Sequence, residues 1–573
     1  MSSSAPPPLT DPPLIVEALG VVLRDAREPV TVLRDVSFTV AAGETVAVLG
    51  ESASGLSALL PAILGLNRAN EAPRRTGTVR VRKSDAGVMV HDDVMALDPT
   101  IRAGRQLASQ VRRRRDIARL RSAAGLDRDA FDPLAYPHQL TAELRQRLMF
   151  AMAAARARTL LLLDEPGSGL DAVARAAFLR DIAALRAETG VALLVLTADP
   201  ATAAALASRV LVLHAGRVIE TGDCASVLSR PAHPYTEALV NARCKLTANR
   251  GQRLLPATDD RPPPGPYLGA SNTGCAFRGP CPAGTTRCGQ LPPLGPAVLH
   301  AGQVACWNVT SPNRHAQQPA RWPALPPPGV APVLVLDGIA YRYPASRPAS
   351  HGGRKLALQD IALRLNERDA VAIAGGEGAG KSTLLRIAAG LLAPTQGRRA
   401  YPGTDLPQMI YRDPMAALPP WRSVGDIVGE RLRIGTLSSA ERATRIEEAL
   451  ALAQLPPEIA DLRPASLTPG QAQRVGIARA LIVPPALLLC DEPLAMLDPR
   501  AAASVLNLLA GLRRTQRMAI LFATDDLPAA RYLTDRIVVL SEGRIVEEGP
   551  AERVAAAPQS PMAQAMFALA AAP

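Results

Sequence analysis

The chain has 573 residues, of which 48% are apolar, so it is long enough to form several domains with separate cores. No run of about 18 residues lacks both charge and proline, which argues against a transmembrane helix. The start of the chain has neither the basic residues nor the apolar run of a secretion signal, so we expect a cytoplasmic protein. The net charge of +12 comes almost entirely from arginine, since there are only four lysines, and charge alone does not indicate a polyanionic partner.

The first structural elements that the sequence predicts form a degenerate phosphate loop. The apolar run ETVAVL (44–49) predicts a strand, and GESASGLS (50–57) predicts a glycine-rich turn that enters a helix. This arrangement points backbone N–H groups at phosphates, but Leu56 stands where the lysine of such a loop is needed. Further along, the apolar run LLLL ends in Asp164 and Glu165.

Four sequence patterns occur twice, in the same order and at nearly the same offset. LLLLDEPGSGLD from Leu160 returns as LLLCDEPLAMLD from Leu487, and VLVLHAGRVIETG from Val210 returns as IVVLSEGRIVEEG from Ile537. ETVAVLGESASGLSALL and LTAELRQRLMFAMAAARA return as DAVAIAGGEGAGKSTLLRI and LTPGQAQRVGIARALIV. Four collinear matches indicate two copies of one domain.

Each copy has strands that are apolar on both faces and alternate with helical patterns. Such strands are typical of a mainly parallel sheet covered by helices. The predicted fold class is therefore α/β, with two tandem P-loop nucleotide-binding domains and a cysteine-rich segment between them. The predicted boundaries are a disordered tail at 1–13, a first domain at 14–229, an extension at 230–310, a proline-rich linker at 311–332, a second domain at 333–550 and a tail at 551–573.

The second copy contains a complete phosphate-binding loop. The loop residues allow backbone N–H groups and a helix N-terminus to face phosphates, Lys381 to reach the β- and γ-phosphates, and the Ser382 hydroxyl to bind Mg²⁺. ATP with Mg²⁺ is therefore the predicted ligand. The predicted loop residues are Gly375, Gly376, Glu377, Gly378, Ala379, Gly380, Lys381, Ser382 and Thr383.

Two carboxylates, Asp491 and Glu492, follow the apolar run ALLLC. At the end of a buried strand, the first can hold the water shell of Mg²⁺ and the second can orient or deprotonate the attacking water. Together with Lys381 they are the predicted catalytic residues. The alternative, two acids at a strand tip without chemistry, is weakened because the same pair occurs in the first copy.

Together these motifs resemble those of ATP-binding cassette (ABC) proteins, with two ABC domains fused in one chain. Asp498 and Asp171 match the D-loop aspartate of that family. The resemblance covers nearly the whole chain and implies that the two domains pair head to tail, each nucleotide lying between one P-loop and the other signature. It also implies that Tyr343 stacks on adenine. The segment similar to the ABC signature LSGGQ consists of Leu467, Thr468, Pro469, Gly470 and Gln471.

Both copies depart from the ABC pattern. In the second copy, Arg412 replaces the Q-loop glutamine and Asp525 replaces the switch histidine. In the first copy, the replaced positions are Leu56 in the P-loop, His91 in the Q-loop, Ala198 in the switch, Leu23 at the adenine-stacking position and LTAEL (140–144) in the signature. The first copy retains Gly50, Gly55, Ser57, Asp164, Glu165 and Asp171.

These replacements predict an unequal pair of sites. We expect weak or no ATP binding at the first loop, normal binding at the second, and slow hydrolysis. In the head-to-tail arrangement each composite site would have one sound half. One hypothesis is that Arg412 and Asp525 compensate for each other, as an ion pair near the γ-phosphate or by lending Arg412 to the phosphate; independent drift is the alternative.

The extension resembles the matching region of dipeptide, oligopeptide and nickel importer ATPases. RPAHPYTEALVNA (230–242) is similar to their His-Pro-Tyr segment. Related importers carry a cysteine cluster there, in some a [4Fe-4S] centre, for which four thiolates are the usual complement. Zinc and unliganded thiols remain alternatives, although the spacing lacks the paired C-x₂-C of most zinc sites. The candidate ligands are Cys275, Cys281, Cys288 and Cys306, whereas Cys224, Cys244 and Cys490 are predicted to be structural.

The resemblance implies an ATPase subunit of an importer that couples ATP hydrolysis to peptide transport at the cytoplasmic face of the membrane. Its implied partners are two integral-membrane permease subunits and an extracytoplasmic solute-binding protein, with no nucleic acid. One alternative is an ATP-binding regulatory or structural ABC protein with little hydrolysis. A soluble ABC protein acting on ribosomes or DNA is supported only by the positive charge, and nickel or another small solute is an alternative cargo.

Overall fold

The computed structural model describes residues 11–24, 29–66, 74–91, 96–111, 113, 116–126, 131–254, 273–309, 320–343, 356–403, 406–434 and 437–570. The chain divides into two compact units. The first takes in residues up to 170, 174–240 and 263–317, and the second takes in 171–173, 241–262 and the residues from 318 onward. Residues 241–262, which the sequence places in the predicted extension, thus group with the second unit.

The first unit has a three-stranded sheet in the order β2-β1-β4 and a larger sheet in the order β10-β11-β9-β8-β3-β7-β6-β5. Its strands are β1 (Leu14–Arg24), β2 (Pro29–Val40), β3 (Thr45–Leu49), β4 (Arg74–Val81), β5 (Ala86–Met89), β6 (Leu160–Asp164), β7 (Ala192–Thr197), β8 (Arg209–His214), β9 (Arg217–Asp223), β10 (Gly295–Pro296) and β11 (Gln303–Val304). Its α-helices are α1 (Leu56–Leu64), α3 (Ala103–Gln110), α4 (Asp116–Ala123), α5 (Ala142–Arg156), α6 (Ala172–Thr189), α7 (Pro200–Leu206), α8 (Cys224–Ser229) and α9 (Pro234–Asn241).

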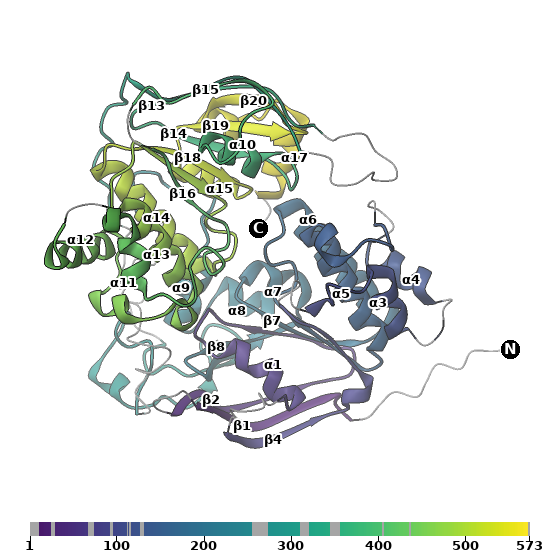
Figure 1. Cartoon of the computed structure of the whole chain (residues 1–573). Coiled ribbons are helices and arrows are strands. Elements are labelled where there is room, and N and C mark those ends of the chain that lie inside the picture. Colours follow the sequence, from purple (N-terminus) through teal and green to yellow (C-terminus); the bar gives the residue numbers. More distant parts are fainter. Residues whose placement is uncertain are drawn as a thin grey trace. The chain divides into compact units, whose positions relative to one another are not determined.

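The second unit, drawn in green to yellow in Figure 1, repeats this plan. Its sheet orders are β13-β12-β15 and β16-β17-β18-β14-β19-β20. Its strands are β12 (Pro332–Arg342), β13 (Leu356–Asn366), β14 (Ala370–Ala374), β15 (Gln396–Ala400), β16 (Gln408–Ile410), β17 (Leu487–Asp491), β18 (Ala519–Thr524), β19 (Arg536–Ser541) and β20 (Arg544–Pro550). Its α-helices are α10 (Lys381–Ala388), α11 (Val424–Val428), α12 (Ser439–Leu452), α13 (Pro469–Leu481), α14 (Pro499–Thr515), α15 (Leu527–Leu533), α16 (Ala551–Ala556) and α17 (Pro561–Ala570).

The central strands confirm the predicted α/β class. In the first unit β3 pairs in parallel with β7 and β8, and in the second unit β14 pairs in parallel with β18 and β19. Every residue of β3, β7, β14 and β18 is buried, as expected for strands covered on both faces. Only the outer pairs β8–β9 and β19–β20 are antiparallel in these sheets apart from the short β10 and β11. The phosphate loops therefore leave the carboxyl ends of central strands, where α/β proteins bind ligands.

The structure describes the predicted tails and linker in part. The predicted tail at 551–573 contains α16 and α17, because Val554, Met566 and Phe567 pack into the core of the second unit. The predicted linker at 311–332 lies partly outside the described residues, and its residues 320–331 form no helix or regular strand. The predicted N-terminal tail also lies mostly outside the described residues.

Candidate nucleotide-binding site

The second phosphate loop connects β14 to α10. Gly378 has φ 75° and Gly380 has φ 106°, so the loop turns through conformations that glycine adopts without strain. Lys381 is the first residue of α10 and only 5% exposed. Its Nζ donates to the carbonyl oxygens of Gly375 at 2.6 Å and Gly376 at 3.1 Å, so the ammonium lies over the loop.

The structure brings the predicted catalytic residues together. The Ser382 hydroxyl donates to Asp491 Oδ1 at 2.8 Å, and Lys381 Nζ lies 2.9 Å from Glu492 Oε1. Glu492 directly follows β17 and has φ 45°, in the left-handed region that costs a non-glycine residue about 1–2 kcal/mol. Its backbone N–H donates to Ala523 O at 3.0 Å, which holds this turn against β18.

Arg412 contributes a contact to this cluster that sequence reasoning missed. It follows β16, is 39% exposed, and places Nη1 3.1 Å from Glu492 Oε2. Glu492 is thus paired with two cations, Lys381 and Arg412. The hypothesis of an ion pair between Arg412 and Asp525 stays a prediction. The signal available in the sequence was the exchange of a neutral glutamine for a cation at a position close to the catalytic glutamate.

Asp525 lies at the end of β18, next to the same charges. The pKa of its carboxyl is raised to about 6, mainly by burial and also by the charge of Glu492, while Lys381 opposes the shift. The neighbouring Asp526 caps α15 by accepting from Ala529 N at 2.9 Å. The switch position of the second copy therefore holds an acid that is partly protonated near pH 6.

The adenine-stacking candidate and the signature segment are also ordered. Tyr343 follows β12, is 45% exposed, and its hydroxyl lies 3.0 Å from Thr383 Oγ1. Thr468 caps α13 reciprocally with Gln471: Gln471 N donates to Thr468 Oγ1 at 3.3 Å and Thr468 N to Gln471 Oε1 at 2.9 Å. Pro469 is the first residue of α13, Gly470 follows it, and Leu467 is buried. Asp498 caps α14 by accepting from Ala501 N at 2.9 Å.

The residues predicted to bind Mg²⁺ have suitable chemistry. Ser382 Oγ and Asp491 Oδ1 are adjacent oxygen atoms at the mouth of the loop. Mg²⁺ prefers oxygen ligands and is usually held by one or two protein groups together with phosphates and water. The described residues contain no group of three or more His, Cys, Asp or Glu side chains arranged to hold a metal ion, and a magnesium site of this kind does not require one.

The first phosphate loop retains its backbone path. Ala53 has φ 77° and Gly55 has φ 98°, close to the values at Gly378 and Gly380. Leu56 begins α1 and is only 7% exposed, packed in the core beneath the loop. Its backbone N–H donates to Ser54 Oγ at 3.3 Å. The loop has thus lost its cation while keeping the turn that would surround an anion.

Glu165 is held differently from its counterpart in the second copy. Thr197 Oγ1 donates to Glu165 Oε2 at 3.0 Å, and the backbone N–H of Ala198 donates to Glu165 Oε1 at 2.7 Å. The pKa of Glu165 is raised to about 8, mainly by burial and also by the charge of Asp164, although these two hydrogen bonds oppose the shift. Burial also raises the pKa of Asp164, while His91 opposes that shift through its charge and a backbone hydrogen bond. At neutral pH, Glu165 is therefore mainly an uncharged acid.

The altered signature of the first copy has acquired a structural ion pair. Glu143 stands where the second copy has Gly470, and its Oε1 lies 2.7 Å from Arg147 Nε. Arg147 is buried and also pairs with Asp181 at 2.6 Å. Thr141 still caps α5 by accepting from Leu144 N at 3.3 Å, but the return contact of a glutamine is lost. Asp171 precedes α6, and Leu23 lies 42% exposed on β1.

The His-Pro-Tyr segment contacts the first phosphate loop, which sequence reasoning did not anticipate. Tyr235, at the start of α9, is fully buried, and its hydroxyl accepts from the backbone N–H of Glu51 at 3.4 Å. The tyrosine ring lies 4.0 Å from the His214 ring and 5.6 Å from the Phe277 ring, measured between centroids. This aromatic cluster joins the importer-type segment to the core of the first unit.

The four candidate cysteines lie near one another. The pKa of Cys275 is raised to about 11, mainly by burial and also by the charges of Cys288, Cys306 and Cys281. Asn308 donates its backbone N–H to Cys306 Sγ and its side-chain amide to Cys288 Sγ, both at 3.4 Å. Within the described part of the chain, however, no three of these thiols form a group suited to a single metal ion.

Two phosphate loops at strand ends, each with a strand-end carboxylate pair and a capped signature helix, define a duplicated P-loop nucleotide-binding protein. The family described as "ABC transporter" matches residues 33–168 and 358–495, and that described as "Oligopeptide/dipeptide transporter, C-terminal region" matches 219–288. The chain therefore belongs to the ABC transporter ATP-binding proteins of the oligopeptide/dipeptide type. No helix in the described residues is long and apolar enough to cross a membrane.

The relatives agree along most of their length. The oligopeptide transport ATP-binding protein OppD of Mycobacterium tuberculosis is 31% identical over 592 residues, covering 95% of this chain and 96% of OppD. The glutathione import ATP-binding protein GsiA of Escherichia coli K12 is 28% identical, covering 97% of this chain and 89% of GsiA. The solved structure of CbiO1 from Clostridium perfringens is 26% identical over 40% of this chain and 92% of CbiO1, with a TM-score of 0.36.

Proposed function

We propose that the chain is the ATP-hydrolysing subunit of an importer of peptides or similar small solutes. The observation that carries this proposal is the convergence of Lys381, Ser382, Asp491 and Glu492 around one phosphate loop. The oligopeptide-type region and the similarity to oligopeptide and glutathione import proteins support a peptide cargo. As partners we propose two permease subunits and an external solute-binding protein, with this chain at the cytoplasmic face of the membrane.

In the proposed reaction, Glu492 orients the attacking water and accepts its proton, while Lys381 binds the β- and γ-phosphates of ATP. Mg²⁺, held by Ser382 and Asp491, would neutralise phosphate charge when bound. Lys381 pairs with Glu492 in the structure, so it must exchange this carboxylate for phosphate oxygens when ATP binds. Glu492 then keeps Arg412 as its cation.

Arg412 and Asp525 are the proposed replacements for the family's two γ-phosphate neighbours. Their proximity to Glu492 favours a shared role over independent drift. The test is ATP turnover in Arg412→Gln, Asp525→His and the double variant. Coupled residues should give a double variant whose loss differs from the product of the two single losses by about 3-fold or more, whereas strictly multiplicative losses would remove the idea.

The four cysteines are the proposed ligands of a [4Fe-4S] cluster. A cluster binds each thiolate to a different iron, so it does not need three thiols to meet at one ion, and N–H donors to the sulfurs like those of Asn308 are typical of such sites. Anaerobically purified chain should be brown and absorb near 400 nm, roughly where such clusters absorb. Cys288→Ser should remove this absorbance. A colourless parent that also lacks iron and zinc would mean that the four thiols bind no metal.

The hydrolysis proposal is tested with the chain assembled with its permease partners, using Glu492→Gln as the blank. Turnover above the blank supports the transport ATPase. Turnover no higher than the blank leaves the alternative, an ABC protein that binds ATP for regulation or structure. That alternative is favoured by one specific observation, the loss of the switch histidine and the Q-loop glutamine in both copies.

A further inference from the structure

A segment outside both nucleotide sites is hydrogen-bonded to α15, the helix that follows the switch position. Residues 244–254, which we call the strap, follow α9 in the chain and lie within the oligopeptide-type region at 219–288. They nevertheless belong to the second unit. A segment that is carried by one repeat but packed in the fold of the other is not explained by the ABC architecture alone.

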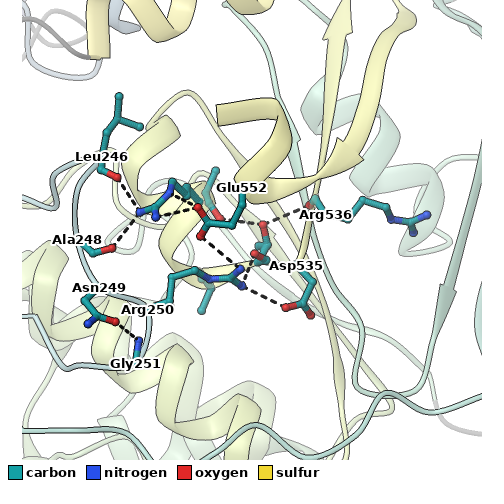
Figure 2. Close-up of polar contacts among 12 residues, drawn as sticks. Leu246, Ala248, Asn249, Arg250, Gly251, Asp535, Arg536 and Glu552 are labelled. Atoms are coloured by element: carbon teal, nitrogen blue, oxygen red, sulfur yellow. Dashed lines mark hydrogen bonds and ion pairs between the residues drawn. The ribbon is translucent and has the colours of Figure 1, made fainter. Parts of the chain in front are cut away.

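The strap is held first by side chains at the C-terminal end of α15. Arg531 Nη1 donates to the backbone carbonyls of Leu246 at 2.6 Å and Ala248 at 2.9 Å (Figure 2). The Tyr532 hydroxyl donates to Gln252 O at 2.8 Å. These three bonds fix the path of the strap backbone against one helix.

Arg250 of the strap in turn binds residues at the end of α15 and beyond it. Its Nη2 donates to Thr534 O at 2.6 Å and to Asp535 Oδ1 at 3.1 Å, and Nη1 lies 3.8 Å from Glu552 Oε1 (Figure 2). Thr534 is the cap residue after α15, and Glu552 lies on α16. One guanidinium therefore joins the strap to the residues that follow α15 and to the next helix.

Both ends of the strap are buried. The amide of Leu254 donates to Asn507 Oδ1 on α14 at 2.9 Å, and Asn507 Nδ2 donates back to Leu254 O at 3.1 Å. Cys244 is buried in the core that also contains Ala529 and Leu533 of α15. Burial raises the pKa of the Cys244 thiol well above its usual value, the charge of Asp526 adds to the shift, and the charge of Arg531 opposes it. The strap thus packs with α15 in one core through Cys244 and is hydrogen-bonded to Arg531 and Tyr532 at the C-terminal end of this helix.

The position of α15 bears on where Asp525 lies, because this residue alone connects Thr524, the last residue of β18, to Asp526, the N-cap of α15. The helix has seven residues, about 10 Å, and a rod this short moves as one body. Its N-cap is Asp526, and the preceding residue is Asp525, whose carboxyl feels the charges of Glu492 and Lys381. A displacement of α15 therefore moves Asp525 relative to the catalytic carboxylate.

We infer that the strap keeps α15 in place and thereby positions Asp525 beside Glu492. Arg250 is the positioning residue. The inference deepens the proposed function, because it assigns the importer-type segment a role in the geometry of the second ATPase site. It also gives a reason why the strap packs in the second unit although it follows the first domain in the sequence.

Loss of Arg250 should not unfold the unit. Asp535 also pairs with Arg513, and Glu552 also pairs with Arg531 at 2.8 Å, so neither acid is orphaned. Burial lowers the pKa of Arg250, the charge of Glu552 opposes this shift, and the nearby charge of Arg531 lowers the pKa as well. The Arg250→Ala variant therefore tests position rather than folding.

The first test is hydrogen exchange of the full chain. In Arg250→Ala, amides of α15 should exchange about 5- to 10-fold faster than in the parent, while those of α10 stay unchanged. Arg250→Lys keeps the charge and should recover part of the protection. Arg243→Ala is the matched control, since Arg243 is an exposed arginine of the same region with no hydrogen bond or ion pair to another described residue. Unchanged exchange in α15 would overturn the inference.

The second test separates position from stability by steady-state ATP turnover. Arg250→Ala should lower kcat about 3- to 10-fold with KM within about twofold, and Arg250→Lys should restore part of kcat. Tyr532→Phe removes the hydroxyl's bond to Gln252 of the strap, together with its bonds to Trp322 and Asn507, and should give the same split. Faster exchange in α15 with unchanged kcat would overturn the positioning of Asp525. If the parent turns over no faster than Glu492→Gln, the hydrolysis proposal fails, and the exchange comparison alone then decides whether the strap holds α15.

Discussion

The two phosphate loops have the same backbone path but different electrostatics. Ala53 and Gly378 have φ 77° and 75°, and Leu56 and Lys381 are both almost fully buried at the start of the following helix. The turn is fixed by the strand, the helix and the core around them, all of which survive in the first copy. Its chemistry depends on one ammonium group, which leucine replaces at little cost to packing. A fold can therefore preserve a nucleotide cradle long after the ligand contact has gone.

The carboxylates that follow the two buried strands have diverged with the lysine. Both have positive φ, 49° at Glu165 and 45° at Glu492, so the same strained turn aims both side chains. Glu492 faces two cations, whereas Glu165 faces the hydroxyl of Thr197 and the amide of Ala198. Without a cation nearby, burial favours the neutral form of Glu165. The first loop thus lacks the lysine of the second, and the carboxyl at its strand end favours the neutral form.

The largest difference between the copies should appear in turnover. Glu492→Gln removes the proposed base and should lower ATP turnover about 10²- to 10³-fold while ATP binding persists. The matched variant Glu165→Gln should leave turnover within about twofold, because Glu165 is mostly protonated near pH 7. Steady-state phosphate release from both variants checks this. A comparable loss in Glu165→Gln would mean that the first copy still contributes a base.

The titration of Glu165 should instead change how the free energy of unfolding depends on pH. Because its folded pKa is raised from 4.5 to about 8, its contribution to stability is fully present below pH 4.5 and is lost as pH rises through about 8. Glu165→Gln does not titrate, so it should gain on the parent as pH rises from 5 to 9, on the order of 3 kcal/mol after allowance for partial exposure. Thermal unfolding at pH 5, 7 and 9 gives this difference. Glu188 is exposed and pairs with Arg119, so Glu188→Gln is the control and should show no such trend.

Nucleotide affinity should separate the loops next. Lys381→Ala removes a charge-assisted contact to phosphate and should weaken binding of an ATP analogue about 10- to 150-fold, equivalent to about 1.5–3 kcal/mol. Leu56→Met is the matched change in the first loop, which keeps the buried volume and should alter binding less than twofold. Titration of a fluorescent ATP analogue measures both. Undiminished binding in Lys381→Ala would remove the second loop from the proposed site.

The sequence predicted the fold well because its signals are local. Strands that are apolar or nearly so, such as 45–49 and 370–374, have one low-energy place, the middle of a covered sheet, and the repeat then predicts the second domain from the first. The predicted tail at 551–573 was different, since the helical burial of Met566 and Phe567 depends on a core built from distant strands. Tertiary packing decided that segment, and no local pattern contained it.

Only those site residues that belong to recognisable motifs could be predicted from the sequence. Lys381, Ser382, Asp491 and Glu492 meet as the loop and strand motifs require. The pairing of Arg412 with Glu492 could not be read from a Q-loop position alone, because it depends on which of several nearby charges the guanidinium reaches. The strap was missed for a similar reason: a stretch such as CKLTANR has no periodicity, and its partners lie almost 300 residues further along the chain.

The smallest difference between the copies concerns the caps of the signature helices. Gln471→Leu gives the second copy the residue of the first and removes the acceptor of the Thr468 amide, which should cost α13 about 0.5–1 kcal/mol. The reverse change, Leu144→Gln, should not stabilise α5, because Leu144 is buried in its own core and an amide there loses apolar packing. Local opening free energies from hydrogen exchange without nucleotide measure both. A gain in Leu144→Gln would show that the first signature can still return to its ancestral cap, whereas a loss would mean that its core has repacked around leucine and fixed the divergence in place.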